Sequence, residues 1–284
     1  MTHVIVLTAP PATGLTDGQI ADVVAQFADP GPVRRLSDSA AEFPVPAPAT
    51  AVAEGLDVNC VPVANRRKRL LIADMDSTMI TVECIDEVAD FAGVRDQVVA
   101  ITEPAMRGEI SFEEALRARV ALIKDLPAAA LQDVWEQRIA LTPGAQVAIA
   151  TMRANGAHTA LVSGGFTFFT ERVGAAIGFD ENHANRLEIA NGVLTGRVHE
   201  PILGRAAKLE ALNRITSAKG MAPSDALAVG DGANDLAMIG AAGLGVAFQA
   251  KPVVAAEADA DVTHADLTAL LYLQGYAQRD FATV

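Results

Sequence analysis

Apolar and polar residues are arranged in short, alternating segments over the first 69 residues. The apolar run Val4–Leu7 is typical of a buried strand. A helix is predicted over residues 16–29, because apolar residues recur at i, i+3, i+4 and i+7 from Ile20 and Thr16 can cap its first turn. Three short strands and one brief helix complete the segment: strands at 33–38, 41–45 and 57–63, and a helix at 49–56. The order β-α-β-β-α-β predicts a small ferredoxin-like α+β sandwich.

The pattern then changes to strands that alternate with helices. Residues 69–75 form an apolar strand that ends in carboxylates, and residues 83–139 have helical periodicity almost throughout. Beyond residue 143 the predicted elements are helices at 145–155, 167–177 and 205–218, and strands at 160–162, 226–230 and 244–248. This alternation predicts an α/β fold with a Rossmann-like parallel sheet and helices on both of its faces.

Two segments depart from that alternation. In residues 186–198 the pair Asn191-Gly192 stands between alternating apolar residues, which is a strong signal of a β-hairpin. The helical block that follows the first strand is an insertion, and we expect it to form a cap over the carboxyl edge of the sheet. Ligands of such sheets bind at that edge.

Proline and charge divide the chain unevenly. Eight of the 14 prolines fall in the first 69 residues, where 6 basic and 7 acidic side chains give a net charge of −1. The remaining residues carry 16 basic and 28 acidic side chains, a net charge of −12. The change predicts a boundary near residues 62–69, with a small domain at 1–65, a larger domain at 66–284 and the helical cap at about 84–140.

The overall charge and the cysteine content exclude several classes of protein. The formal net charge is −13, which argues against a nucleic-acid or an anionic-membrane partner because both attract basic surfaces. Two cysteines cannot build a disulfide framework or a cysteine-based zinc site. We see no signal-peptide pattern and no apolar run of membrane-spanning length, so the sequence predicts a cytoplasmic protein.

The first candidate for chemistry is the pair of carboxylates directly after the first strand of the large domain. Asp74 and Asp76 stand at i and i+2, so their carboxylates repel each other. A fold would retain such a pair if a cation binds between them or if the pair has a function. A turn closed by aspartate side chains, or a helix cap, explains them equally well.

Three further candidates follow later elements. Ser163 and Gly164 lie at a strand-to-helix turn that suits an anion, although an ordinary glycine turn has the same composition. The segment Gly230–Asp235 is not a dinucleotide motif, because acids stand where glycines are needed, and Asp231 suits a hard divalent cation. Lys208, taken alone, reads as a surface charge.

In combination these residues resemble the haloacid dehalogenase superfamily of phosphotransferases, and within it the phosphoserine phosphatases. The resemblance spans about residues 69–275. The segments that carry it are DMDSTMITVECIDEVA (74–89), AMRGEISFEEALRARVALIKDL (105–126), LVSGGF (161–166), ANRLEIANGVLTG (184–196) and AVGDGANDLAMI (228–239). The second segment lies in the predicted cap, where it would shape the choice of substrate.

The resemblance implies an aspartyl-phosphate mechanism. Asp74 would be the nucleophile, and Asp76 the acid that protonates the leaving oxygen and later the base that activates water. The remaining roles are those of ligands. Mg²⁺ would be held by Asp74, the Asp76 backbone carbonyl and Asp231, with Asp235 in support, and the phosphoryl group by Ser163, Gly164, Lys208 and Asn234.

The resemblance also implies a substrate pocket in the cap. Arg119 would bind the carboxylate of an amino acid, since a guanidinium pairs with it bidentately, and Glu83 would bind its ammonium group. Phe112 and Met106 would line the pocket. Their spacing alone fits cap core for Phe112 and Met106 and a surface charge for Arg119.

The implied function is hydrolysis of O-phospho-L-serine to L-serine and phosphate, the last step of L-serine biosynthesis. One alternative is phosphoryl transfer to a small alcohol such as homoserine. Another is a non-catalytic amino-acid sensor, which would be expected to lack the nucleophile or a metal ligand. Many phosphoserine phosphatases carry N-terminal modules similar to ACT domains. The first 65 residues are therefore expected to be a reduced ACT-like module, either for packing within the chain or for dimerisation as a homodimer.

Overall fold

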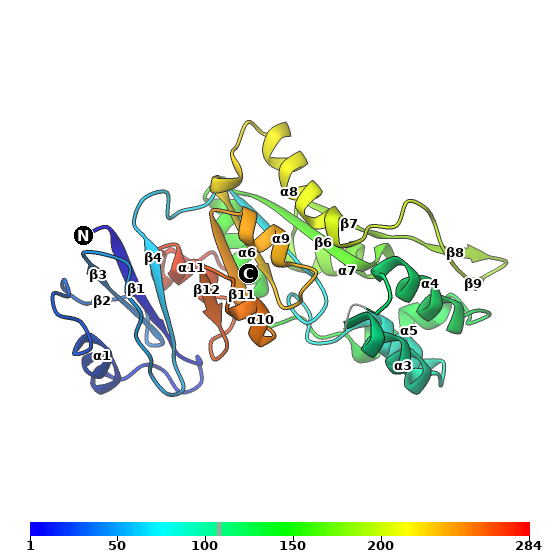
Figure 1. The fold of residues 1–284 in the computed structure, drawn as a ribbon, viewed down its shortest axis with the longest axis horizontal. Coiled ribbons are helices and arrows are strands. Elements are labelled where there is room, and N and C mark those ends of the chain that lie inside the picture. Colours follow the sequence, from blue (N-terminus) through cyan, green and yellow to red (C-terminus); the bar gives the residue numbers. More distant parts are fainter. Residues whose placement is uncertain (107–108) are drawn as a thin grey trace.

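The computed structural model describes residues 1–106 and 109–284, which form three parts along an elongated molecule (Figure 1). An antiparallel sheet lies at the N-terminal end, a parallel sheet with flanking helices lies in the middle, and the cap helices lie at the far end. In the described part of the chain, no helix combines the length and apolar character that crossing a membrane requires.

The N-terminal sheet has four antiparallel strands in the order β2-β3-β1-β4. Its elements are β1 (His3–Thr8), α1 (Asp17–Val24), β2 (Arg34–Arg35), β3 (Ala40–Val45) and β4 (Asp57–Pro62). The predicted N-cap of α1 is present, because the Thr16 side chain accepts the Gln19 N–H and the Gln19 side chain accepts the Thr16 N–H. Ile20 and Val23 of α1 pack on one face of the sheet against Ile5 and Phe43.

The helix predicted at residues 49–56 is not formed, and this prediction was wrong. Val52 is 82% exposed, whereas Leu56, Ala51 and Ala53 pack on the core of the small sheet without forming a helix. The Gln26 side chain accepts the Val52 N–H (3.3 Å) and donates to the Val52 carbonyl oxygen (3.0 Å), which satisfies the backbone without a helix. The small α+β layer therefore has one helix where a ferredoxin-like sandwich has two.

The central sheet has six parallel strands in the order β12-β11-β10-β5-β6-β7, as the predicted α/β fold requires. The strands are β5 (Leu70–Ala73), β6 (His158–Phe166), β7 (Glu181–Asn185), β10 (Ala226–Gly230), β11 (Leu244–Phe248) and β12 (Ala260–Val262). All four residues of β5 are buried. Leu70 and Ile72 face one helical layer, and Leu71 and Ala73 face the other.

Helices cover both faces of this sheet. One layer contains α6 (Ala145–Ala154), α7 (Thr167–Ile177) and α11 (Ala269–Leu273), and the other contains α8 (Arg205–Ala218), α9 (Leu236–Ala241) and α10 (Pro252–Ala255). Short 3₁₀ turns lie at Pro223–Asp225 and Gln278–Asp280. The predicted helices at 145–155, 167–177 and 205–218 are confirmed.

The cap consists of the predicted helical block and the predicted hairpin. Its elements are α2 (Cys84–Phe91), α3 (Arg95–Met106), α4 (Phe112–Leu122), α5 (Ala129–Arg138), β8 (Leu187–Ala190) and β9 (Val193–Val198). Asn191 and Gly192 have φ values of 51° and 79°, as a tight hairpin turn needs. The hairpin joins the cap through two backbone bonds of Leu194, one from Asp125 N–H and one to the Leu126 carbonyl, both 2.9 Å.

The face of the N-terminal sheet opposite α1 packs on the central part of the molecule. Val4 and Val6 of β1 share a buried cluster with Tyr272 and Tyr276, at and just beyond the end of α11. The carboxylate of Asp57 accepts the N–H groups of Thr263, His264 and Ala265 (each 2.9 Å). This face of the sheet is therefore covered within the chain.

Candidate active site

The candidate residues meet where three neighbouring parallel strands end. Asp74 directly follows β5, Ser163 lies in the last part of β6, and Asp231 directly follows β10. These strands are adjacent in the order β10-β5-β6, so their carboxyl ends share one edge of the sheet. This edge is where ligands of open α/β sheets bind.

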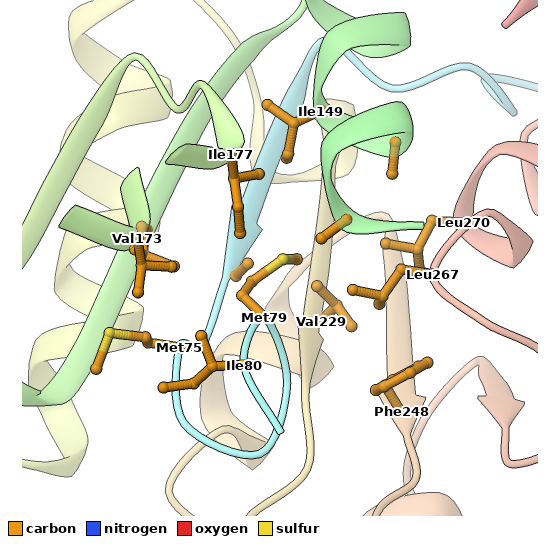
Figure 2. Close-up of a cluster of buried hydrophobic side chains, with 14 of the residues drawn as sticks. Met75, Met79, Ile80, Ile149, Val173, Ile177, Val229, Phe248, Leu267 and Leu270 are labelled. Atoms are coloured by element: carbon orange, nitrogen blue, oxygen red, sulfur yellow. The ribbon is translucent and has the colours of Figure 1, made fainter. Parts of the chain in front are cut away.

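The loop after β5 is fixed by apolar side chains that alternate with its carboxylates. Met75, Met79 and Ile80 are fully buried and, as Figure 2 shows, point into the core among Ile149, Val173 and Val229 of the surrounding elements. Burial of this order stabilises each side chain by about 1.5–3 kcal/mol. These buried side chains anchor the loop, which places Asp74 and Asp76 just beyond the end of β5.

Lys208 joins two of the carboxylates. Its Nζ lies 2.7 Å from Oδ1 of Asp74 and 2.6 Å from Oδ1 of Asp235, and all three side chains are nearly inaccessible to solvent. Burial alone would lower the pKa of Lys208, but the two carboxylates raise it above its ordinary value, so the group stays charged. The lysine that reads as a surface charge in the sequence is thus buried at the centre of the site.

Asp74, Asp231 and Asp235 can present oxygen atoms within 4.8 Å of one another. Burial, together with the charge of Asp74, raises the pKa of Asp231 to about 7 and that of Asp235 to about 7. Three carboxylates thus lie together here, and Lys208 is in ion-pair contact with two of them. Such a group of hard oxygen ligands fits a divalent cation.

Asp76 occupies a different environment from Asp74. Its Oδ1 accepts the Cys84 N–H (2.8 Å) and its Oδ2 accepts the Ser163 hydroxyl (3.1 Å). Burial, followed by the charges of Glu83 and Asp74, raises the pKa of Asp76 to about 7. A carboxyl group with such a pKa can hold a proton near neutral pH and release it, as a general acid and base must.

The loop Ser163-Gly164-Gly165 lies beside Asp76. The Ser163 hydroxyl oxygen accepts the Gly165 N–H (2.8 Å) while its proton is donated to Asp76. The ring of Phe112 lies against Gly164 so closely that a β-carbon there would come within 2.9 Å of it. The first residue of the cap helix α4 is therefore in contact with this loop.

Two charged cap residues, Glu83 and Arg119, interact electrostatically with each other and with carboxylates of the sheet edge. Glu83 accepts a hydrogen bond from the Ser77 hydroxyl (2.8 Å), and Ser77 has a φ of 54° in the left-handed region. Burial raises the pKa of Glu83, as do the charges of Asp74 and Asp86, against the opposing effects of Ser77 and Arg119. Burial lowers the pKa of Arg119 against the raising effects of Glu83, Asp86 and Asp76. Arg119 is thus electrostatically linked to Glu83 and to Asp76.

A comparison of the sequence with models of protein families shows which family the chain belongs to. The model of the haloacid dehalogenase-like hydrolases matches residues 71–240, which include the strand ends described above. The chain belongs to the haloacid dehalogenase-like hydrolases. Phosphatases of this family generally use a divalent metal ion, and the cluster of Asp74, Asp231 and Asp235 fits one.

Among relatives of this haloacid dehalogenase-like hydrolase are phosphoserine phosphatases. One from Archaeoglobus fulgidus is 45% identical over 218 residues, which are 76% of this chain and 63% of that protein, so the chain spans less than two thirds of its length. One from Albidiferax ferrireducens is 44% identical over 231 residues, 79% of this chain and 98% of that protein. A solved structure described as a phospho-aspartyl intermediate analogue of phosphoserine phosphatase has a TM-score of 0.68, 41% identity, and covers 72% of this chain and 98% of that one.

Asn234 and Met106 complete the set of predicted site residues of the hydrolase. Asn234 lies half-buried in the loop that follows β10, between Gly232 and the N-terminus of α9. The Met106 side chain lies outside the described residues. The structure also brings the Ser77 hydroxyl to Glu83 and the Cys84 N–H to Asp76. Sequence reasoning missed both contacts, although these residues stand next to predicted ones.

Proposed function

We propose that this hydrolase is a Mg²⁺-dependent phosphoserine phosphatase that converts O-phospho-L-serine to L-serine and phosphate. One observation carries the proposal. Asp76 accepts the hydroxyl of Ser163 from the sheet edge and interacts electrostatically with Glu83 and Arg119 of the cap. Groups suited to a phosphoryl ester and groups suited to an amino acid therefore converge on one carboxyl group. The reaction would be the last step of L-serine biosynthesis in the cytoplasm.

The first half of the proposed reaction breaks the ester bond. A carboxylate oxygen of Asp74 attacks phosphorus and forms an aspartyl-phosphate, while the bond from phosphorus to the seryl oxygen breaks. Asp76 gives its proton to that oxygen, so L-serine leaves as the neutral alcohol. The raised pKa of Asp76, about 7, supports its assignment as the acid.

The second half restores the enzyme. Asp76, now ionised, takes a proton from a water molecule whose oxygen attacks phosphorus, and the bond between phosphorus and Asp74 breaks to release phosphate. Lys208, which is paired with Asp74 and Asp235, stabilises the negative charge on the phosphoryl oxygens in both halves of the reaction.

The phosphoryl oxygens need further partners at the sheet edge. We assign these contacts to the Ser163 hydroxyl, the Gly164 N–H and Asn234. Mg²⁺ would be held by Asp74, the Asp76 carbonyl and Asp231, with Asp235 in support, and would neutralise charge on the phosphoryl group when bound.

Recognition of the amino acid is assigned to the cap. Arg119 would bind the substrate carboxylate bidentately, and Glu83 would bind its ammonium group. Phe112, which lies over Gly164, and Met106 would line the pocket around the seryl methylene. The names of the relatives at 44–45% identity support the same substrate class.

The N-terminal segment is proposed to be a separate small module, residues 1–65, attached to a phosphatase domain of residues 66–284. One face of its sheet packs on α11 and the residues after it, and Asp57 holds residues 263–265. A homodimer through this module would therefore use the face that carries α1, or the edge strand β2.

The test is release of phosphate and L-serine from O-phospho-L-serine by the purified chain, with and without Mg²⁺. We expect Mg²⁺-dependent turnover by the wild type and none by a folded Asp74→Asn variant; an active, folded Asp74→Asn variant would contradict the mechanism. Added L-homoserine separates the transferase alternative, because a phosphotransferase would form phosphohomoserine. Absence of turnover with any ester would favour a non-catalytic sensor.

A further inference from the structure

Asn185, the last residue of β7, connects two segments that both border the proposed phosphoryl pocket. It is buried, with 2% of its surface exposed. Its Nδ2 donates to the carbonyl oxygens of Gly164 (2.9 Å) and Leu203 (3.3 Å), and its Oδ1 accepts the Leu203 N–H (2.7 Å). Because two acceptors and one donor surround the amide, its partners fix its orientation.

The segment on the first side of this amide is an irregular part of β6. β6 and β7 pair in register up to Val162 and His183 and again at Phe166 and Asn185, with a shift between the two pairs. Ser163, Gly164 and Gly165 occupy that shift. A carbonyl group displaced from the ladder needs another donor when it is buried, and for Gly164 the Asn185 side chain supplies it.

The segment on the second side leads to Lys208. Leu203 lies two residues before α8, and Lys208 is the fourth residue of that helix. The cap rests on the same two segments: a side chain at Gly164 would collide with Phe112, and one at Gly204 with Glu113. The Asn185 amide thus bonds to both segments that contact the cap.

We propose that Asn185 is a positioning residue, which holds the Ser163-Gly164 loop and the start of α8 at a fixed separation so that Ser163 and Lys208 reach the same phosphoryl group. The inference rests on the proposed phosphatase function. Since the phosphoryl group is common to all phosphomonoesters, the effect of Asn185 is independent of the rest of the substrate.

The first test compares Asn185→Ala with Asn182→Ala. Asn182 lies on the same strand, and its Oδ1 accepts the Thr170 hydroxyl (2.9 Å), away from the loop. In Asn185→Ala we expect kcat/KM to fall about 10- to 100-fold, the cost of slightly misplaced groups, by the same factor for O-phospho-L-serine and p-nitrophenyl phosphate. The inhibition constant of inorganic phosphate should rise alongside. Asn182→Ala should retain the wild-type values.

The second test uses Asn185→Asp and also covers the case in which the alanine variant fails to fold. The introduced carboxyl group accepts the Leu203 N–H when ionised but repels the Gly164 carbonyl, and it can donate to that carbonyl only when protonated. The activity of Asn185→Asp, divided by that of the wild type at the same pH, should therefore rise as the pH falls. A role in folding alone predicts a ratio that does not depend on pH.

The proposal is overturned if a folded Asn185→Ala variant keeps wild-type kcat/KM, or if it loses Tm while its phosphate inhibition constant is unchanged. Failure of the proposed function would give a different experimental result. A wild-type enzyme that hydrolyses p-nitrophenyl phosphate but not O-phospho-L-serine would refute the substrate assignment, and Asn185 would still be tested with the first ester.

Discussion

The ammonium nitrogen of Lys208 lies 2.7 Å from the carboxylate oxygen Oδ1 of Asp74, with both side chains shielded from solvent. Removal of this charge should affect both stability and catalysis. In Lys208→Met we expect kcat/KM to fall at least about 100-fold, as when a charge-stabilising donor is lost. The metal-free protein should lose about 3–5 kcal/mol of unfolding free energy, because buried carboxylates lose their partner.

The control is Lys219→Met, which removes an exposed lysine at the C-terminal end of the same helix. Activity assays and chemical denaturation of both variants provide the measurement. Equal behaviour of the two variants would show that Lys208 is not part of the site.

Metal binding should depend on pH. The pKa values of Asp231 and Asp235 are raised to about 7, and the cation binds only their ionised forms. Protons therefore compete with Mg²⁺ below pH 7, so its dissociation constant should increase as the pH falls from 8 to 6. The rise in Tm on adding Mg²⁺ should shrink in parallel.

Titration calorimetry at pH 6, 7 and 8 measures this constant directly. Asp231→Asn should bind Mg²⁺ much more weakly at every pH, whereas Asp22→Asn, a change on the exposed side of α1, should behave as the wild type. An affinity that stays constant between pH 6 and 8 would refute the assignment of these ligands.

Arg119 should determine the choice of substrate. In Arg119→Ala we expect kcat/KM for O-phospho-L-serine to fall about 100-fold, the effect of losing a bidentate, charge-assisted pair. The kcat/KM for p-nitrophenyl phosphate should change little. Arg119→Lys should not restore the loss, since an ammonium group cannot reproduce the planar fork.

Arg117 is the matched control on the same helix. It is exposed and paired with Glu200 on the neighbouring loop (2.7 Å). Arg117→Ala should leave the ratio of the two kcat/KM values at its wild-type level. If Arg119→Ala lowers kcat/KM for both esters by the same factor, the guanidinium does not bind the amino-acid part of the substrate.

Asp57 should stabilise the junction between the N-terminal sheet and the rest of the chain. Its buried carboxylate accepts three backbone N–H groups of residues 263–265. Asp57→Ala should lower the unfolding free energy by about 2–4 kcal/mol, because these groups lose a charged partner. Denaturant unfolding followed by fluorescence should show one transition for the wild type, with the exposed Asp38→Ala as control. An unchanged midpoint in Asp57→Ala would show that the junction contributes little.

Much of the fold could be predicted because its elements depend on local patterns. Helices α6, α7 and α8 have clear apolar faces, and the Asn191-Gly192 turn has a required backbone conformation. β7 was not predicted, since an edge strand with the sequence ENHAN has no apolar alternation and is held by its neighbour β6. The helix expected at residues 49–56 does not form, because the Gln26 side chain bonds the Val52 backbone groups, a contact that the local pattern does not contain.

The site shows the same division. The carboxylates after β5 and β10 stand out because acids directly after buried strands are costly, whereas Lys208 has no local signal and gains its meaning from Asp74 and Asp235, which are distant in sequence. Asn185 is recognisable only in three dimensions, where its amide joins Gly164 to Leu203.

The most direct test of the account is a panel of Mg²⁺-dependent kcat/KM values for O-phospho-L-serine, phosphothreonine, phosphohomoserine and p-nitrophenyl phosphate. The proposed binding of the amino acid by Glu83 and Arg119 predicts that kcat/KM for O-phospho-L-serine exceeds that for each of the other esters by at least about tenfold, the effect of one lost polar contact of about 1.4 kcal/mol. Equal values across the four esters would contradict a cap pocket that recognises the amino acid.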